Sequence, residues 1–527
     1  MSAVSENKRS ILRGSFGSAA ATLLSRVLGL LRVILEARVL GGSALASVWT
    51  MAFAIPNMFR RLLGEGALSQ ALIPMMAHTE SEKGLTEVRK QLACVLSVLA
   101  MLLIVISVVT GIIGILIGNY STTGYIKDAM YLLPWLMPYA VFICLVGVMT
   151  AIVNTRRVFF LASLNALILN VVMILLLLAA STFGGNSDSR LLYILTGGVL
   201  VSGVLQVLML GWLLKRCGVF PIFKKSERSS RSILKELFHL TLPGMIGGGA
   251  TQLSFLIDRT IALNVSEYAV PALNYTERLV YLPVGIVAVA LSSVLMADMS
   301  RAAANKKFDE MMDDMSLGLR LVWFGCTPLA VFMIAYREPL IRMLFQYGRF
   351  TAENAAATAD TLLFYALGIP AFCAAKVILP AFYARKKMQT PLRISLTCIA
   401  LNIPLSIALM FPLKQGGIAL ATVIAQMLNN TLLLYFLRRD HLTPKWGEIV
   451  LTVVRSVGFS LIAILPVFWY ESIKKYLFND WLAIGACVIF FGIFYLGGQL
   501  MAKAPEPGEF IGSLRSRKAG RKKADGA

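Results

Sequence analysis

The chain has 527 residues, of which 57% are hydrophobic and only 15% are charged. Soluble proteins carry about 25% charged residues, so this composition excludes an ordinary water-soluble domain and indicates a membrane protein. The formal net charge of +22 comes without a nucleic-acid-binding motif, and its basic residues lie in short clusters between apolar runs. No nucleic-acid partner is therefore expected.

About fourteen apolar runs follow one another along the chain. A bilayer core needs about 20 mostly apolar residues per helix. By that measure we expect spans centred near residues 28, 53, 105, 142, 171, 204, 250, 287, 330, 367, 401, 427, 460 and 490. The connections are short, except for the basic stretch 215–235 in the middle. The sequence therefore predicts an all-α polytopic membrane protein with about fourteen transmembrane helices.

A weak repeat relates the two halves of the chain. Residues 67–73, ALSQALI, follow a proline in the second span, and residues 290–296, ALSSVLM, follow a proline in the eighth. Because six spans is an even number, the halves should have the same orientation, as in transporters built from two parallel lobes. The predicted parts are an N-terminal six-helix lobe (1–217), a basic linker (218–235), a C-terminal six-helix lobe (236–440), a terminal helix pair (441–505) and a basic tail (506–527).

Basic residues are concentrated in every second connection. Clusters of Lys and Arg follow the fourth, sixth, eighth, tenth and twelfth spans, whereas intervening connections such as GNYSTTGYIKDAM hold few. By the positive-inside rule, the basic connections and both termini should be cytoplasmic. The tail LRSRKAGRKKADGA is either a topology anchor or a binding segment for anionic lipid head groups.

The first span carries charges that a bilayer should exclude. An arginine at mid-membrane costs at least about 2.5–3.5 kcal/mol, yet Arg26 and Arg32 lie here, about 120° apart on the helix wall with Gly29 between them. Two guanidinium groups beside a residue without a side chain would admit a bulky anion, and their fork suits phosphate oxygens. Alternatively, these side chains reach the interface or pair locally, as Arg32 and Glu36 could.

Further charged residues lie in other spans. The second span ends with Arg60 and Arg61, and the eighth contributes Arg278. Arg38 and Arg61 are the arginines most readily explained as plain interface residues. The other polar candidates are Ser25, Glu65, Glu277 and Lys376. Because cations outnumber the acids placed to neutralise them, we expect a hydrated cavity that binds a phosphate or pyrophosphate.

One acid stands apart from this group. Asp258 lies in the seventh span, and Asn402 and Thr422 in the eleventh and twelfth spans could join it. Oxygen ligands of this kind suit a hard cation such as Na⁺, or a proton relay. Equally, Asp258 could form an interfacial pair with Arg259. No other cofactor is expected, because the seven cysteines and three histidines are scattered without metal-ligand spacing.

At these residues the chain resembles the MurJ (MviN) family of lipid II flippases, within the MOP flippase superfamily. The resemblance rests on SRVLGLLR (25–32), IPNMFRRLLGEGALSQALIP (55–74) and NYTERLVYLPVGIVAVALSSVLM (274–296), and continues through LFQYGRFTAENAAAT (344–358) and LGIPAFCAAKVILPAFYARKKMQTP (367–391). It implies two six-helix lobes around a central cavity and a terminal helix pair that forms a groove for a polyprenyl tail.

The resemblance also implies roles for particular positions. Those that match the family's cavity arginines are Arg26, Arg32, Arg60 and Arg278, with Glu65 and Lys376 as further polar positions. Some members bind sodium between the seventh, eleventh and twelfth spans. The matching positions here are Asp258, Asn402, Ser406, the carbonyl of Ile418, and Thr422.

The chain departs from the family's usual pattern at four positions. Val33, Ser47, Tyr281 and Ser406 stand where relatives often carry an acid. Without an acid at position 406, Asp258 is the only formal charge of the implied sodium site. Transport driven mainly by membrane potential therefore stays open beside Na⁺ or H⁺ coupling.

The sequence thus predicts a bacterial inner-membrane flippase that moves lipid II from the cytoplasmic to the periplasmic leaflet by alternating access. It would act as a monomer among membrane lipids, alone or with cell-wall synthesis machinery. The alternatives are a flippase for another polyprenyl-linked glycan and a cation-coupled exporter of the same superfamily. A membrane enzyme would need a carboxylate pair or metal motif on a loop, which the sequence lacks. A non-transporting scaffold would not need the cavity arginines.

Overall fold

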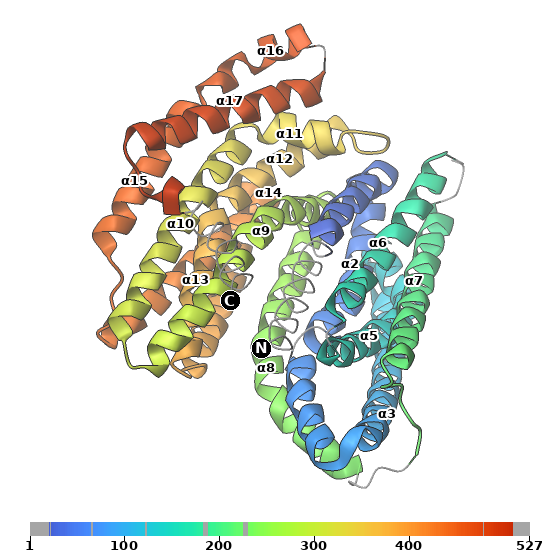
Figure 1. The fold of residues 1–527 in the computed structure, drawn as a ribbon. Coiled ribbons are helices and arrows are strands. Elements are labelled where there is room, and N and C mark those ends of the chain that lie inside the picture. The colour runs from blue at the N-terminus through green and yellow to red at the C-terminus, as the bar shows by residue number, and fades with distance from the viewer. Residues whose placement is uncertain are drawn as a thin grey trace. The chain divides into compact units, whose positions relative to one another are not determined.

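The structure, a computed structural model, describes residues 21, 23–64, 67–121, 124–156, 158–182, 188–224, 230–477 and 479–509. All regular elements in these ranges are helices, and they form two compact units, Met1–Leu263 (unit 1) and Asn264–Ala527 (unit 2). The predicted all-α fold is therefore confirmed. Figure 1 shows the chain coloured from its N-terminus to its C-terminus.

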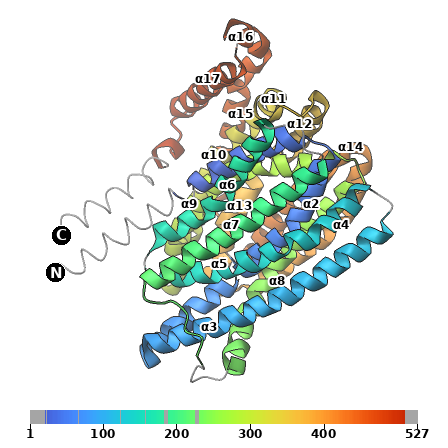
Figure 2. The same ribbon diagram turned by 90° about the vertical axis from the view of Figure 1, so that its right-hand side faces the viewer.

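Unit 1 opens with a helix over residues 23–40. It continues through α2 (Ala44–Phe59), the π-helical turn η1 (Arg60–Gly64), α3 (Ala67–Tyr120), α4 (Gly124–Leu136), α5 (Pro138–Thr155), α6 (Phe159–Thr182), α7 (Asp188–Arg216) and α8 (Ser230–Leu263). The long helix α3 packs against α4, α5 and α8 (Figure 2). Part of the core lies where Leu133, Met137 and Ala140 are buried beneath Ile55, Phe59 and Ile106.

Unit 2 comprises α9 (Ala269–Ala304), α10 (Phe308–Ala335), α11 (Arg337–Phe345), α12 (Ala352–Leu367), α13 (Ile369–Ala384), α14 (Gln389–Arg439), α15 (Trp446–Ala463), the 3₁₀ turn η2 (Leu465–Trp469), α16 (Tyr470–Leu477) and α17 (Asp480–Met501). The helix α13 packs against α9, α10 and α14 and is buried along most of its length. The helix α15 packs against α10 on one side and α17 on the other.

The outward faces of these helices are apolar, as a bilayer requires. In α3, Met101, Val105, Val108 and Ile112 are all about half exposed or more. Exposed apolar surface on this scale is uncommon on soluble proteins and matches lipid. Among the described residues, nine helical stretches are long and apolar enough to cross a membrane. Some of these stretches contain two helices, and each of the fourteen predicted span centres lies in a described helix, so the predicted number is consistent with the structure.

Two of the long helices are each two helices joined at a break. In α3 the break is Gly84, whose φ of 77° lies in the left-handed region that glycine adopts without strain. In α14 the break is Lys414, with φ 50° and ψ −135°. The chain turns back at Lys414, and the turn brings Gly417 against the backbone of Leu409: a Cβ at Gly417 would lie 2.0 Å from the Leu409 carbonyl oxygen. Small residues at such crossings let helices approach closely where lipid offers no hydrophobic driving force.

Four helices of unit 2 end with a non-glycine residue in the left-handed region. These residues are Lys306, Lys386, His441 and Lys503, with φ between 51° and 61°. After α17, the N–H of Lys503 donates to Leu500 O and the N–H of Ala504 donates to Gln499 O, both at 3.0 Å. This pair of bonds is the Schellman motif, which usually contains glycine. A lysine there has a steric cost but brings positive charge to the carbonyl-rich helix end.

The predicted lobes and the two compact units divide the chain at different places. The predicted boundary at 218–235 assigns the seventh span to the C-terminal lobe, whereas α8 packs against α2, α3 and η1 within unit 1. The predicted basic tail begins at Glu506, a residue that is fully buried within unit 2. The lobe boundaries were predicted from the sequence repeat, whereas the two units are defined by how compactly the chain packs. The boundaries of the lobes therefore stay a prediction.

Candidate functional site

Arg32 is the most deeply buried of the predicted cavity arginines, with 6% of its surface exposed. Its Nε lies 3.4 Å from Glu36 Oε1, one helical turn further on, and its guanidinium lies 5.9 Å from the centre of the Phe53 ring of α2. Among the described residues, Nε has no hydrogen-bond partner. One turn of helix thus places a buried cation beside a single acid and an aromatic ring, with hydrogen-bonding capacity left for a ligand.

The helix over residues 23–40 also carries Arg26, Gly29 and Ser25, of which Arg26 and Ser25 are half-buried. The amide of Asn170, from α6, donates to the Ser25 carbonyl oxygen at 3.2 Å. The same amide covers Gly29, because a Cβ at that position would lie 3.8 Å from Asn170 Nδ2. The predicted notch therefore lies at a contact between helices, and the role of Gly29 in binding an anion stays a prediction.

Arg60 and Arg61 lie in the π-helical turn η1 directly after α2. Single π-turns inside helices occur frequently at functional sites. The Nε of Arg60 donates to Asn57 Oδ1 at 2.8 Å, so the preceding helix α2 orients the guanidinium. Arg61, for which an interface position stays a prediction, donates to Gln252 Oε1 of α8 at 3.2 Å and lies 6.0 Å from the Phe255 ring. Glu65 lies outside the described residues.

In unit 2, Glu277 and Arg278 are adjacent and half-buried on α9. Tyr365 of α12 donates to Glu277 Oε1 at 3.3 Å, so this acid is tied to a neighbouring helix. Lys376 on α13 is exposed although the residues on either side of it are buried. The structure therefore places Arg278 and Lys376 in unit 2 and Arg26, Arg32 and Arg60 in unit 1.

Of the four positions where the resemblance implies an acid in relatives, Val33, Ser47 and Ser406 are buried in this chain and Tyr281 is half-buried. Val33 is fully buried and Ser47 is 1% exposed. Tyr281 packs against Phe372, with ring centres 5.5 Å apart. A neutral side chain at each of these positions avoids the cost of burying an unpaired carboxylate.

The residues predicted for a sodium site are divided between the units. Asp258, on α8 in unit 1, is 5% exposed. In unit 2, Ser406 Oγ donates to Asn402 Oδ1 at 3.4 Å, and Thr422 Oγ1 donates to Ile418 O at 3.1 Å. These donors are all oxygens and most are buried, which fits a hard monovalent cation. Among the described residues, no group of three or more His, Cys, Asp or Glu side chains could hold a metal ion.

Two further arginines, the buried Arg320 and the half-buried Arg455, were not predicted from the sequence. Arg320 on α10 and Arg455 on α15 both form ion pairs with Glu506. Arg320 stands within the apolar run LGLRLVWF, which was an available signal. Their partner is 186 residues away from Arg320, and such a pairing cannot be read from one sequence.

Long apolar helices in two units, with a buried guanidinium in the first span and half-buried ones in the π-turn after the second, are typical of a polytopic transporter. A solved inward-facing multidrug resistance MATE family transporter of the MOP superfamily has a similar fold, with a TM-score of 0.69 at 12% identity, covering 79% of this chain and 94% of that one. A solved structure described as lipid II flippase MurJ in an inward closed conformation is similar with a TM-score of 0.76 at 24% identity, covering 92% and 98%.

Sequence comparison identifies the family. The profile of the family described as "Lipid II flippase MurJ" matches residues 36–486. A probable lipid II flippase MurJ of Rhizobium tropici is 32% identical over 440 residues, 81% of each chain. The lipid II flippase MurJ of Burkholderia cenocepacia is 29% identical over 495 residues, 90% of this chain and 94% of that protein. The chain belongs to the MurJ family of lipid II flippases.

Proposed function

We propose that this chain flips lipid II from the cytoplasmic to the periplasmic leaflet of the bacterial inner membrane by alternating access. Membership of the lipid II flippase family supports the substrate. The observation that carries the mechanism is Arg32, a guanidinium 6% exposed in an apolar span with Glu36 as its nearby acid. A cation so placed is costly unless it serves a ligand or a hydrated path.

In this mechanism the pyrophosphate binds to arginines from both units. Arg26, Arg32 and Arg60 from unit 1 and Arg278 from unit 2 would form charge-assisted hydrogen bonds to its oxygens, which guanidinium forks suit. An inside-negative membrane potential would act on the empty, positive cavity with about 2.3 kcal/mol per charge per 100 mV. It would thereby favour return of the unloaded transporter to its inward-open state. No covalent bond is made or broken, so the chain is a transporter and not an enzyme.

The polyprenyl tail would remain in the lipid phase along α15 and α17. Both helices expose apolar side chains, including Val450 and Val454 on α15 and Ile489 and Ile493 on α17. Both termini would be cytoplasmic, since the basic connections follow even-numbered spans. We propose that one chain suffices for transport, with membrane lipids and lipid II as its direct partners.

Complementation tests this function. In cells depleted of their own lipid II flippase, expression of the chain is expected to restore growth and the appearance of lipid II in the outer leaflet, measured by labelling from the periplasmic side. Cells with an empty vector are the control. Normal insertion of the chain without any recovery of outer-leaflet lipid II would refute the assignment.

We further propose that Asp258, Asn402 and Thr422 hold a Na⁺ ion, with Ser406 and the Ile418 carbonyl as further oxygen ligands. The bound cation would neutralise the buried Asp258 carboxylate. A ligand that binds the native state stabilises it, by about 2.7 kcal/mol at a hundredfold excess over its Kd. Na⁺, compared with K⁺ at equal ionic strength, should therefore raise the thermal unfolding temperature of the wild type.

Replacing Asp258 by asparagine should remove the difference between Na⁺ and K⁺. The matched control is Asp298→Asn, which removes a partly exposed carboxylate paired with Arg301 on α9 and should keep the difference. An equal Na⁺ effect in the wild type and in Asp258→Asn would rule out this site.

A further inference from the structure

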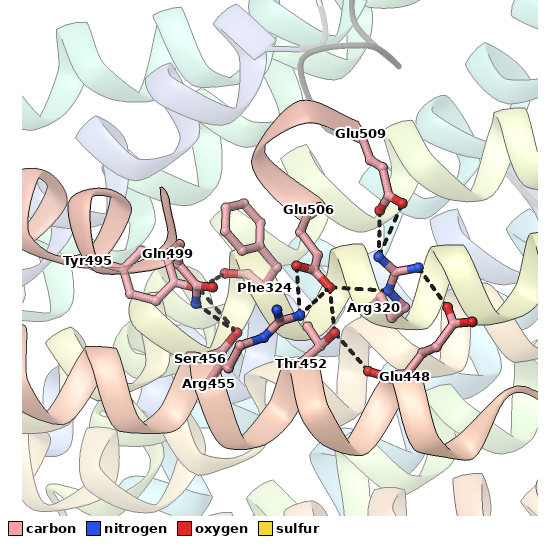
Figure 3. Close-up of polar contacts among 10 residues, drawn as sticks. All are labelled: Arg320, Phe324, Glu448, Thr452, Arg455, Ser456, Tyr495, Gln499, Glu506 and Glu509. Atoms are coloured by element: carbon pink, nitrogen blue, oxygen red, sulfur yellow. Dashed lines mark hydrogen bonds and ion pairs between the residues drawn. The ribbon is translucent and has the colours of Figure 1, made fainter. Parts of the chain in front are cut away.

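A fully buried carboxylate lies just beyond the last span. Glu506 follows α17 and has no exposed surface. It accepts hydrogen bonds from Thr452 Oγ1 at 2.6 Å, from Arg455 Nη2 at 3.1 Å and from Arg320 Nε at 3.2 Å. Arg320 belongs to α10 and the other two to α15, so one carboxylate joins two helices and the segment after a third (Figure 3).

Arg320 is shared among three carboxylates. Besides Glu506, its Nη1 donates to Glu448 Oε2 at 2.9 Å, and its Nη2 donates to Glu509 at 3.1 and 2.9 Å. Figure 3 shows the guanidinium between the three acids. The five N–H donors of a guanidinium point outward in one plane, so Arg320 can make four bonds to three acids, more than the three donors of a lysine ammonium allow.

The backbone after α17 is shaped to bring these acids to Arg320. The Schellman turn at Lys503 reverses the chain directly after the helix. A short helical turn over residues 506–509 then follows, closed by a bond from Glu509 N–H to Pro505 O. The left-handed backbone conformation of Lys503 is unfavourable for a residue with a side chain. Packing of the segment that follows must therefore stabilise this conformation.

A second set of contacts joins the same helices further along α17. Tyr495 donates to the Phe324 carbonyl of α10 at 2.6 Å, and its hydroxyl oxygen lies 3.2 Å from Ser456 Oγ of α15, within hydrogen-bond distance. Gln499 donates to the Tyr495 hydroxyl at 3.2 Å. These hydrogen bonds join neutral groups, whereas the bonds at Glu506 join ionised groups and are charge-assisted, so the contacts of Glu506 are the stronger part of the attachment.

The charges around Glu506 keep it ionised. Burial by itself raises the pKa of its carboxyl, but the Thr452 hydrogen bond and the Arg455 and Arg320 cations outweigh this effect, so the pKa lies below its usual value of 4.5. The other charged groups that face this network among the described residues include Glu448, Glu509 and Lys445. A lowered acid pKa contributes stability above the unfolded-state value and loses it as pH falls through the folded-state value. The network is consequently intact at neutral pH.

We propose that Arg320 and Glu506 are positioning residues that dock α15, α17 and residues 502–509 on α10, so that the helix pair moves with unit 2 as one body. The inference rests on the proposed function in one respect, the assignment of the polyprenyl tail to α15 and α17. A helix pair fixed on α10 would present the tail with an unchanging apolar path while the substrate head group crosses. A loosely attached pair would lose the tail during the same movement.

Two measurements on the full-length protein test this proposal. The first is the distance distribution between spin labels at two exposed positions, Asp309 on α10 and Ile493 on α17, in a cysteine-free background. The wild type should give one narrow distribution. Glu506→Gln keeps the side-chain volume but removes the charge and should broaden the distribution. The matched control is Asp440→Asn, which breaks ion pairs with Arg385 and Lys387 beside α13 and α14 and should leave it narrow.

The second measurement is flipping of lipid II with a full-length polyprenyl tail and of an analogue with a tail too short to reach the helix pair. For Glu506→Gln we expect flipping of the full-length substrate to fall about tenfold, the effect of 1.4 kcal/mol, with the short-tail analogue unaffected. Arg320→Lys should show the same selective loss, because a lysine ammonium has three donors on one nitrogen and cannot make the four bonds of Arg320. Asp440→Asn should flip both substrates at the wild-type rate.

The results distinguish failure of the positioning role from failure of the proposed function. An unchanged label distribution in Glu506→Gln, or an equal loss for both tail lengths, would overturn the positioning role. If the wild type flips neither substrate, the proposed function fails, while the label distances still decide whether Glu506 docks the helix pair. If Glu506→Gln does not insert, Glu509→Gln replaces it, because that side chain is 33% exposed and its loss weakens the same docking.

Discussion

Replacing Arg32 by alanine is expected to lower the exposure of lipid II in the outer leaflet about 30-fold or more. Removing one partner of a buried charged contact costs roughly 2–5 kcal/mol, and 1.4 kcal/mol is a factor of ten. The substitution would remove a guanidinium that is 6% exposed and leave Glu36 buried without its cation. Both the loss of phosphate contacts and the unpaired acid lower transport. The measurement is outer-leaflet lipid II in flippase-depleted cells, at matched levels of inserted protein.

Two other substitutions on the same helix serve as comparisons for Arg32→Ala. Arg38 is exposed, so Arg38→Ala should leave lipid II exposure at the wild-type level. Arg32→Lys keeps a charge beside Glu36 but loses the planar fork, so it should insert normally with partial transport. Full activity of an inserted Arg32→Ala protein would show that the buried guanidinium does not bind the substrate.

Gly417→Ala is expected to destabilise the protein by about 3 kcal/mol or more. A Cβ at this position would lie 2.0 Å from the carbonyl oxygen and 2.4 Å from the carbonyl carbon of Leu409. Overpacking in a tight core typically costs 1–3 kcal/mol, occasionally more. Here the obstacle is backbone, which cannot rotate away like a side chain. The hairpin within α14 would have to open, and the thermal unfolding temperature of the purified protein should fall markedly.

The control for this substitution is Gly492→Ala on α17. No heavy atom lies within 4 Å of a Cβ built at that position. Alanine is the better helix former by about 1 kcal/mol, so the unfolding temperature should stay the same or rise slightly. Equal unfolding temperatures for Gly417→Ala and Gly492→Ala would contradict the close approach within α14.

Apolar runs were sufficient to place fourteen span centres within helices, because a bilayer imposes length and composition on each span. They did not separate shorter helices such as α4, α11, α13 and α16, which contain no predicted centre. The ends of the helices were harder to predict from the sequence. Glycine marks most left-handed helix ends, and Gly84 follows that rule, but Lys306, Lys386, Lys414 and Lys503 occupy positive φ where a sequence analysis expects solvent-exposed lysines. The tertiary contacts after these residues, and not their own preferences, decide their conformation.

The parts of the candidate site that could be predicted are the charged residues that lie within apolar segments. Arg26, Arg32 and Arg60 stand out in apolar segments, and the structure places each on a helix or π-turn within unit 1. Partners could not be predicted, because Asn170 over Gly29 and Gln252 beside Arg61 come from distant parts of the chain. The segment predicted as a basic tail contains two acids, Glu506 and Glu509. These acids were the feature of the sequence that could have indicated packing of this segment against cations.

The part of α3 that follows the break at Gly84 is longer than a bilayer is thick. The helix after it runs over residues 85–120, 36 residues by subtraction, or about 54 Å at 1.5 Å per residue, against a hydrocarbon core of about 30 Å. The exposed apolar band begins at Met101, and residues 101–120 alone are long enough to fill that core. Residues 85–100, which include Glu87, Arg89 and Lys90, therefore extend the helix beyond the hydrocarbon core, with one face buried against the protein at Val88 and Leu92. Soluble reagents can then reach its exposed positions, such as Leu85 and Thr86, without entering the membrane.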